Sequence, residues 1–153
     1  MDLKKTLHKL SYLKWIFLIS LVILIFYCFI ALPENLITII GMIIFIAGIW
    51  LGLDSLSDIA KMSQKEVNRY NSTNLAKQQF KTILYITILL VLISFLFLSL
   101  KFIFPSKNEE LFNEFFNLGL NCWALILGLL CLLKSIYEKE SFAKSQINNQ
   151  QTE

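Results

Sequence analysis

The Asp, Glu, His, Lys and Arg residues of this 153-residue sequence lie outside the long apolar blocks, with the exception of Lys101. Asp54, Asp58 and Lys61 form one such group, and the four-residue spacing of the two carboxylates places both on one side of a helix. The same spacing is common on a solvated helix face. We therefore predict no catalytic residues and no enzymatic function.

Histidine and cysteine offer neither a metal site nor a redox site. His8 is the only histidine, and a lone imidazole cannot build a metal centre or hold a haem. Cys28, Cys122 and Cys131 all lie within apolar blocks, and none belongs to a C-x-x-C pair. Such thiols behave as small apolar side chains. We predict no cofactor and no metal.

Three polar residues of the third apolar block, Thr87, Ser94 and Lys101, recur at helical spacing. If the protein forms oligomers, this polar stripe could line a narrow path through the membrane. The alternative is structural, because Thr and Ser in membrane helices usually donate to their own backbone. Lys101 would then extend to the interface or pair with an acidic residue of segment 109–114.

Small residues form a stripe on the second apolar block and another on the fourth. The stripes are Gly41, Gly48 and Gly52 in the second block, and Asn121, Ala124 and Gly128 in the fourth. Small residues let helix backbones approach closely in lipid, and Asn121 could hydrogen-bond across the contact. We predict that the stripes pack the chain's own helices. In the alternative, the glycine stripe docks a second protein or a second copy.

The elements that position these residues are membrane spans. The sequence is 56% hydrophobic and 16% charged, against about 45–50% and about 25% in a typical soluble domain. Each apolar block approaches or exceeds the length that crosses a bilayer. We predict an all-α polytopic membrane protein, a single domain 1–153 forming a bundle of four transmembrane helices in two hairpins. The expected spans are 15–32, 36–53, 82–104 and 115–133.

The basic residues predict the topology. Twelve Lys and Arg residues fall in segments 1–14, 54–81 and 134–153, against two between the third and fourth spans. The positive-inside rule then places both termini and the middle segment in the cytoplasm. We expect a multi-pass protein of the cell (inner) membrane. The dominance of Lys over Arg, with abundant Ile, Asn and Phe, suggests a bacterial source.

Two polar segments are also expected to be helical. In segment 3–13, leucines share one face among basic residues, which predicts a short helix lying among the lipid headgroups. Segment 54–81 shows helical periodicity on both sides of a turn at 71–74, which predicts a helical hairpin in the cytoplasm.

The functional prediction follows from this distribution. A net charge of +3 is too small to indicate nucleic acid as a partner. Besides the lipid bilayer, we expect a protein partner or a homo-oligomer, because the spans lack chemistry while the cytoplasmic segments are charged. The leading hypothesis is an accessory subunit or a protective, immunity-type factor. The alternative is a small oligomeric channel or transporter.

Overall fold

The computed structural model describes residues 3–31, 35–58, 75–103 and 109–150. These residues form four α-helices: α1 (Leu3–Ala31), α2 (Leu36–Asp58), α4 (Leu75–Ile103) and α5 (Glu109–Gln150). Each helix contains a stretch long and apolar enough to cross a membrane. The predictions of an all-α fold and of four helices with the length and composition of membrane spans are confirmed.

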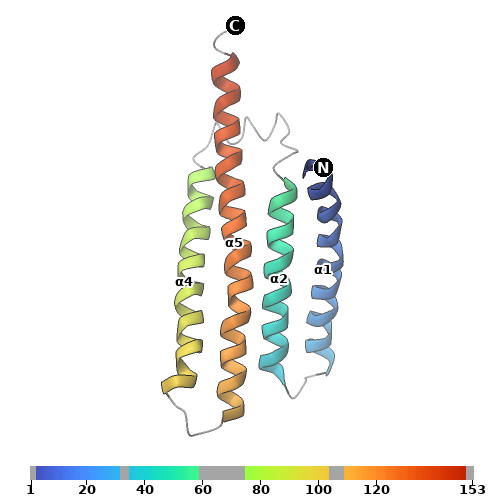
Figure 1. The fold of residues 1–153 in the computed structure, drawn as a ribbon, viewed down its shortest axis with the longest axis vertical. Helices are drawn as coiled ribbons and strands as arrows, with labels where there is room; N and C mark the ends of the chain where they lie inside the picture. The colour runs from blue at the N-terminus through green and yellow to red at the C-terminus, as the bar shows by residue number, and fades with distance from the viewer. Residues whose placement is uncertain (1–2, 32–34, 59–74, 104–108, 151–153) are drawn as a thin grey trace.

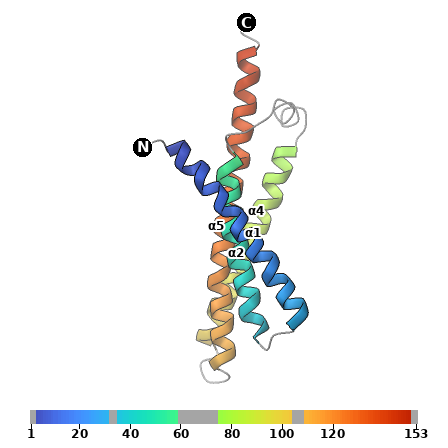
Figure 2. The ribbon, with the colours of Figure 1, turned by 90° about the vertical axis from the view of Figure 1, so that its right-hand side faces the viewer.

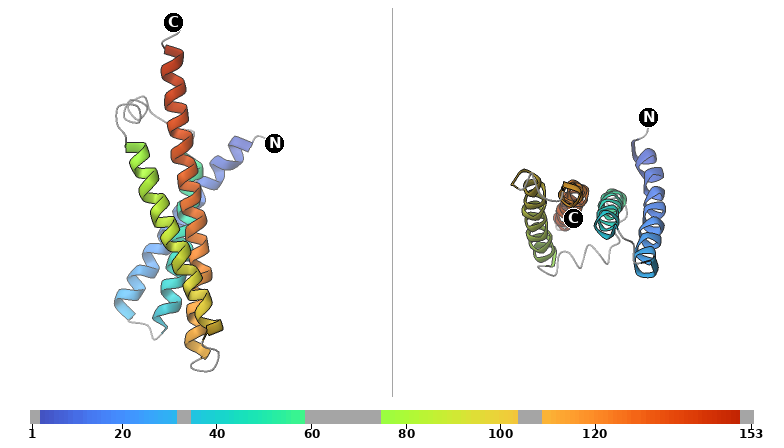
Figure 3. Two further views of the ribbon diagram at one scale, coloured as in Figure 1. Left: turned by 90° about the vertical axis from the view of Figure 1, so that its left-hand side faces the viewer. Right: turned by 90° about the horizontal axis from the view of Figure 1, so that it is seen from below.

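The four helices stand in a single row rather than in a closed bundle. Seen along the helices, the order is α1, α2, α5 and α4 (Figure 3). The extensive contacts follow that order, because α1 packs on α2, α2 on α5, and α5 on α4. The two predicted hairpins are therefore present, but the prediction of a bundle is corrected to an open layer in which α5 and α2 are central.

The position of the small residues explains the row. α2 and α5 carry the two stripes that permit close approach, and they form the central pair. The span of α1 consists mostly of Leu, Ile and Phe, which hold a neighbouring backbone at a distance. Burial is greatest in α5 and least in α1. In the most apolar window of each helix, 33% of the residues are buried in α5, 11% in α2 and in α4, and 0% in α1.

α1 is one uninterrupted helix, so the prediction of a separate short helix over 3–13 is corrected. No glycine or proline occurs between Leu3 and Ala31 to end it. The helix is tilted across the other three, and its N-terminal end points away from them (Figure 2). The first turns of α1 therefore continue the line of its span.

α5 extends well beyond its predicted span, which ended at Leu133. It has 42 residues, a length of about 63 Å at 1.5 Å per residue, and its C-terminal part projects past the other helices (Figure 1). Two ion pairs at i, i+4 support this part: Lys134 with Glu138 at 3.7 Å, and Lys144 with Glu140 at 2.7 Å. The segment predicted only as a tail is helical to Gln150.

α1 and α4 begin, and α2 and α5 end, at the same end of the layer (Figure 1). We call this the terminal end, and the opposite one the far end. α2 continues to Asp58 and α4 starts at Leu75, as the periodicity predicted. The rest of the predicted cytoplasmic hairpin, residues 59–74, lies outside the described residues. The cytoplasmic orientation of the terminal end stays a prediction.

Candidate functional site

Among the glycines of the described helices, the tightest fit lies in the α2–α5 contact. A Cβ atom added to Gly48 would overlap the backbone of Ala124 and Leu125. A Cβ added to Gly128 would likewise overlap the carbonyl oxygen of Gly48. Because both obstacles are backbone atoms, no side-chain movement can make room. Each backbone thus requires glycine in the other at this crossing.

The fit loosens in both directions from Gly48. A Cβ at Gly41 would lie 2.6 Å from Asn121 Nδ2, at the end of a side chain that can turn away. A Cβ at Gly52 would lie 3.8 Å from the Cα of Gly128, an ordinary van der Waals distance. The structure therefore places the two predicted stripes against each other. Among the described residues, Asn121 contributes packing here without a side-chain hydrogen bond.

The α4–α5 contact encloses two of the three residues of the polar stripe. Thr87 and Ser94 are buried, with exposed fractions of 5% and 0%. The Thr87 hydroxyl donates to the carbonyl of Ile83 in its own helix at 2.8 Å, whereas the Ser94 hydroxyl donates across the contact to the carbonyl of Gly119 at 2.8 Å. Within one chain, both hydroxyls therefore face the helix contact and line no open path.

Gly119 makes this cross-helix hydrogen bond possible. A Cβ added to Gly119 would lie 3.1 Å from the Leu98 side chain and 3.2 Å from the Ser94 carbonyl oxygen. The other four glycines belong to the stripes predicted from the sequence, whereas Gly119 belongs to neither. The available signal was its position two residues before Asn121, within the most polar part of the fourth apolar block.

Lys101, the third residue of the polar stripe, is exposed near the far end of α4. Its Nζ lies 4.9 Å from the centroid of the Phe116 ring on α5, a cation–π contact. Within the described residues it forms no ion pair with Glu109, Glu110 or Glu114. Glu114 instead accepts a 3.5 Å hydrogen bond from the hydroxyl of Thr38 on α2.

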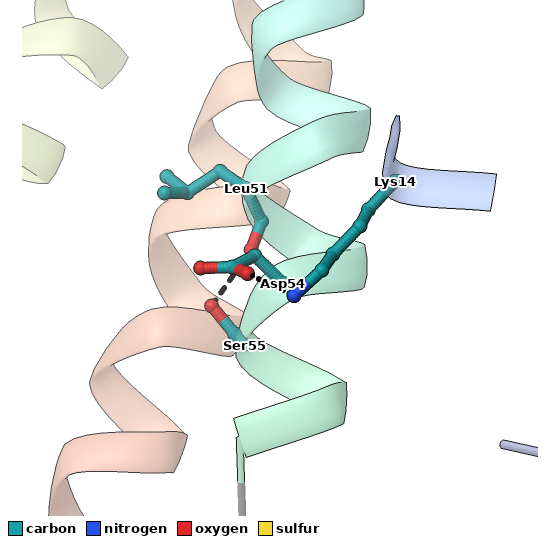
Figure 4. Close-up of polar contacts among 4 residues, drawn as sticks. All are labelled: Lys14, Leu51, Asp54 and Ser55. Carbon is teal, nitrogen blue, oxygen red and sulfur yellow. Dashed lines mark hydrogen bonds and ion pairs between the residues drawn. The ribbon is translucent and has the colours of Figure 1, made fainter. Parts of the chain in front are cut away.

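An ion pair connects α1 to α2 near the terminal end. Lys14 Nζ lies 2.8 Å from Asp54 Oδ1, and the two side chains are 22% and 37% exposed (Figure 4). Lys14 Nζ also lies 5.9 Å from the centroid of the Trp15 ring. The next residue after Asp54, Ser55, is buried and donates to the carbonyl of Leu51 at 2.7 Å. Asp54 is thus engaged by another helix, whereas the sequence suggested a solvated face.

The span boundaries contain a signal for this pair that sequence analysis overlooked. Lys14 immediately precedes the first predicted span, and Asp54 immediately follows the second. In an antiparallel hairpin of two spans of equal length, these positions lie at the same depth. Because Lys14 and Asp54 carry opposite charges at the same depth of one hairpin, an ion pair between them could have been predicted.

The described part of the chain holds no group of three or more metal-ligating side chains. Cys122 is buried, Cys28 and Cys131 are half-buried, and all three are free thiols. The contacts above join the chain's own helices, by close backbone packing at Gly48 and Gly128 and by polar pairs near both ends. Comparison with protein-family models, curated proteins and solved structures found no match to the chain.

Proposed function

We propose that the protein acts by contact with another membrane protein, as an accessory subunit or as an immunity-type protective factor. It would do so in the cell membrane, with the terminal end in the cytoplasm. The proposal assigns no catalysis to the chain. The observation that supports the proposal is the open row of helices. In a row, each edge helix has an extensive contact with one neighbour, so its other faces are available to a partner.

The edge helix α1 offers the largest surface of this kind. Exposed aromatic and branched side chains run along its whole span; they include Trp15, Ile19, Ile23, Phe26 and Phe29. Lipid tails cover such a surface as well as protein does, so burying it brings no hydrophobic gain. Specificity for a partner helix would therefore come from the fit in shape between the two helices. The exposed face of α1 is long enough for such a helix to pack against it.

α5 provides a second surface beyond the expected span. Tyr137 and Phe142 are 66% and 48% exposed there. They lie about 6 Å and about 14 Å beyond Leu133, which places Tyr137 among the headgroups and Phe142 beyond them. Exposed aromatic side chains outside the lipid tails are the more informative kind, because lipid tails do not cover them there. A partner that binds both α1 and the projecting part of α5 would contact the protein inside and outside the membrane.

Site-specific photocrosslinking in cells tests the proposal. A photoreactive phenylalanine derivative replaces Phe26 on α1 or Phe142 on α5 with little change in shape. The matched control is Phe115, which is half-buried and stacks on Phe97 with the ring centroids 5.6 Å apart. We expect one foreign protein to be captured from the exposed positions and not from Phe115. Capture of foreign protein from none of them, or equally from all three, would contradict the proposal.

The alternative function, an oligomeric channel or transporter, has one observation in its favour. Lys101 is exposed on edge helix α4, so several copies could place a ring of lysines at the far end. Crosslinks between copies of the chain alone would favour this alternative. Ion flux into liposomes, lost in Lys101→Gln while that variant keeps its helix content and its oligomeric state, would then establish it.

A further inference from the structure

An open groove of about 520 Å³ lies between α4 and α5 near the terminal end. It includes none of the exposed side chains proposed for partner contact. Its lining residues come equally from the two helices: Gln78, Gln79, Thr82, Ile83, Leu132, Ser135, Ile136 and Lys139. Ser135 and Ile136 are buried, whereas Gln78, Gln79 and Thr82 are exposed. The groove thus has a closed inner wall and a polar entrance.

The hydroxyl of Ser135 lacks the partner that buried hydroxyls elsewhere in the layer have. Ser135 is 2% exposed, yet within the described part of the chain its hydroxyl makes no hydrogen bond. The buried hydroxyls of Ser55 and Thr87 each donate to the carbonyl four residues earlier in their own helix. Buried polar groups are nearly always hydrogen-bonded, to protein or to a bound molecule. The Ser135 hydroxyl therefore has a hydrogen bond to donate to a molecule in the groove.

The depth of Ser135 indicates which acceptor it would meet. The fourth expected span ends at Leu133, so Ser135 lies about 3 Å beyond the apolar part of α5. On the other wall, Thr82 is the first residue of the third expected span. This level lies between the hydrocarbon core and the headgroups of a bilayer, where the ester carbonyls of glycerolipids are found. An ester carbonyl accepts hydrogen bonds and donates none, which complements a free hydroxyl hydrogen.

The rest of the lining suits the remainder of such a molecule. Ile83 and Leu132 are half-buried and lie on the membrane side of Thr82 and Ser135, where an acyl chain would run. At the entrance, the amides of the two glutamines are uncharged, and Lys139 already has an interaction within the chain. The groove therefore combines hydrogen-bonding and apolar groups, and its charge selects no particular headgroup.

We propose that this groove binds one ester-linked acyl chain of a membrane glycerolipid, whatever the headgroup. The Ser135 hydroxyl would donate to the ester carbonyl, and the acyl chain would pass Leu132 and Ile83 toward the bilayer. A water molecule would satisfy the hydroxyl but leave the apolar lining uncovered. A glycerolipid does both, with its polar and apolar parts in the order in which the bilayer presents them.

Native mass spectrometry of the full chain tests this. The protein, released from detergent micelles, is offered diester and diether phosphatidylcholine of the same chain length, which differ in the carbonyl oxygens. We expect it to retain the diester lipid about fivefold better, the ratio that one uncharged hydrogen bond supplies. Ser135→Ala should remove that preference. The matched control is Ser141→Ala, because Ser141 is exposed on the same helix outside the groove; it should keep the preference.

A second variant tests the groove itself. Thr82→Phe places a ring in the groove, and we expect it to reduce retention of both lipids severalfold while helix content and melting stay unchanged. Its control is Leu84→Phe, since Leu84 lies about 200° around α4 from Thr82 and outside the lining; retention should not change.

Four results would overturn the proposal. They are equal retention of diester and diether lipid by the unsubstituted chain, a preference that survives in Ser135→Ala, unaltered retention in Thr82→Phe, and a preference for the diester that is absent when both lipids carry a phosphatidylglycerol headgroup.

Discussion

The α2–α5 contact and the α1–α2 contact join helices in opposite ways. In the first, Gly48 and Gly128 bring the two backbones together, with no room for a Cβ atom on either side. In the second, an ion pair near the terminal end joins α1 to α2, while α1 leaves its span exposed. The first contact depends on shape at its central crossing, and the second has an ion pair near one end.

This difference shows how one layer can contain a fixed part and an adaptable part. Backbone-to-backbone packing restricts the register, because a shift of α2 by one to three residues brings a larger side chain to the crossing. The α1–α2 contact has no such glycine crossing among the described residues: half-buried side chains of α1 pack on α2, and an ion pair adds an attachment near the terminal end. We expect substitutions to separate the two contacts by the size of their effects.

Gly48→Ala should have the largest effect. The added methyl would overlap backbone of α5, so the helices must separate, and we expect a loss of about 2 kcal/mol in unfolding free energy. The measurement is unfolding in mixed micelles with increasing SDS, followed by tryptophan fluorescence. The matched control is Gly52→Ala, whose new Cβ meets its nearest atom at 3.8 Å; its unfolding free energy should change by less than about 0.5 kcal/mol. Equal losses would refute the proposed difference in fit.

Ser94→Ala should have the next largest effect. It tests whether the α4–α5 contact, like the α2–α5 contact, depends on close packing at a buried position. It removes a buried hydrogen bond to Gly119, and we expect a loss of about 1 kcal/mol in the same SDS titration. Thr87→Val is the control, since the Thr87 hydroxyl donates within its own helix. A larger loss in Thr87→Val than in Ser94→Ala would show that the cross-helix bond does not hold the contact.

Lys14→Gln should cost less, about 0.5 kcal/mol, because both charged groups of the pair are partly exposed. A double-mutant cycle with Asp54→Asn isolates the interaction of the two side chains from their separate effects. The interaction energy should shrink in high salt, since a partly exposed pair is screened. An interaction energy of zero at low salt would show that the Lys14–Asp54 pair does not stabilise the α1–α2 contact.

Thr38→Val should have the smallest effect. Its hydrogen bond to Glu114 is long, at 3.5 Å, and exposed, so we expect a change below about 0.3 kcal/mol. The same titration measures it, with Glu114→Gln as the companion variant. A loss as large as that of Ser94→Ala would mean that the far end holds α2 and α5 together as firmly as the buried contacts do.

The four apolar helices could be predicted because span length and composition are properties of short windows, independent of neighbours. The helical faces of Gly48 and Gly128 could be predicted from spacing for the same reason. Which face meets which neighbour could not, because periodicity gives the direction of a side chain and not its partner. The bundle prediction was wrong for this reason: it assumed a closed ring of contacts around residues whose partners were unknown.

The extension of α5 was missed for a different reason. Hydropathy falls at Leu133, and the predicted element ended there, although loss of apolar character does not end a helix. The chain after Lys134 contains neither glycine nor proline and has ion pairs one turn apart, so the helix continues. The Lys14–Asp54 pair was missed although the span boundaries implied it, because each charge was assigned to a segment rather than to a depth.

The continuity of α5 has a geometric consequence for whatever binds its projecting part. In an unbroken helix each residue fixes the rotational phase of all later ones, at about 100° per residue. One residue inserted after Lys134 would turn the exposed Tyr137 and Phe142 through that angle relative to the membrane layer, while seven inserted residues would nearly restore their direction. The direction in which the two aromatic rings point around the helix axis is therefore fixed, as is their distance from the membrane layer. Because α5 is continuous, a rotation imposed on the rings would also act on the Gly48–Gly128 crossing.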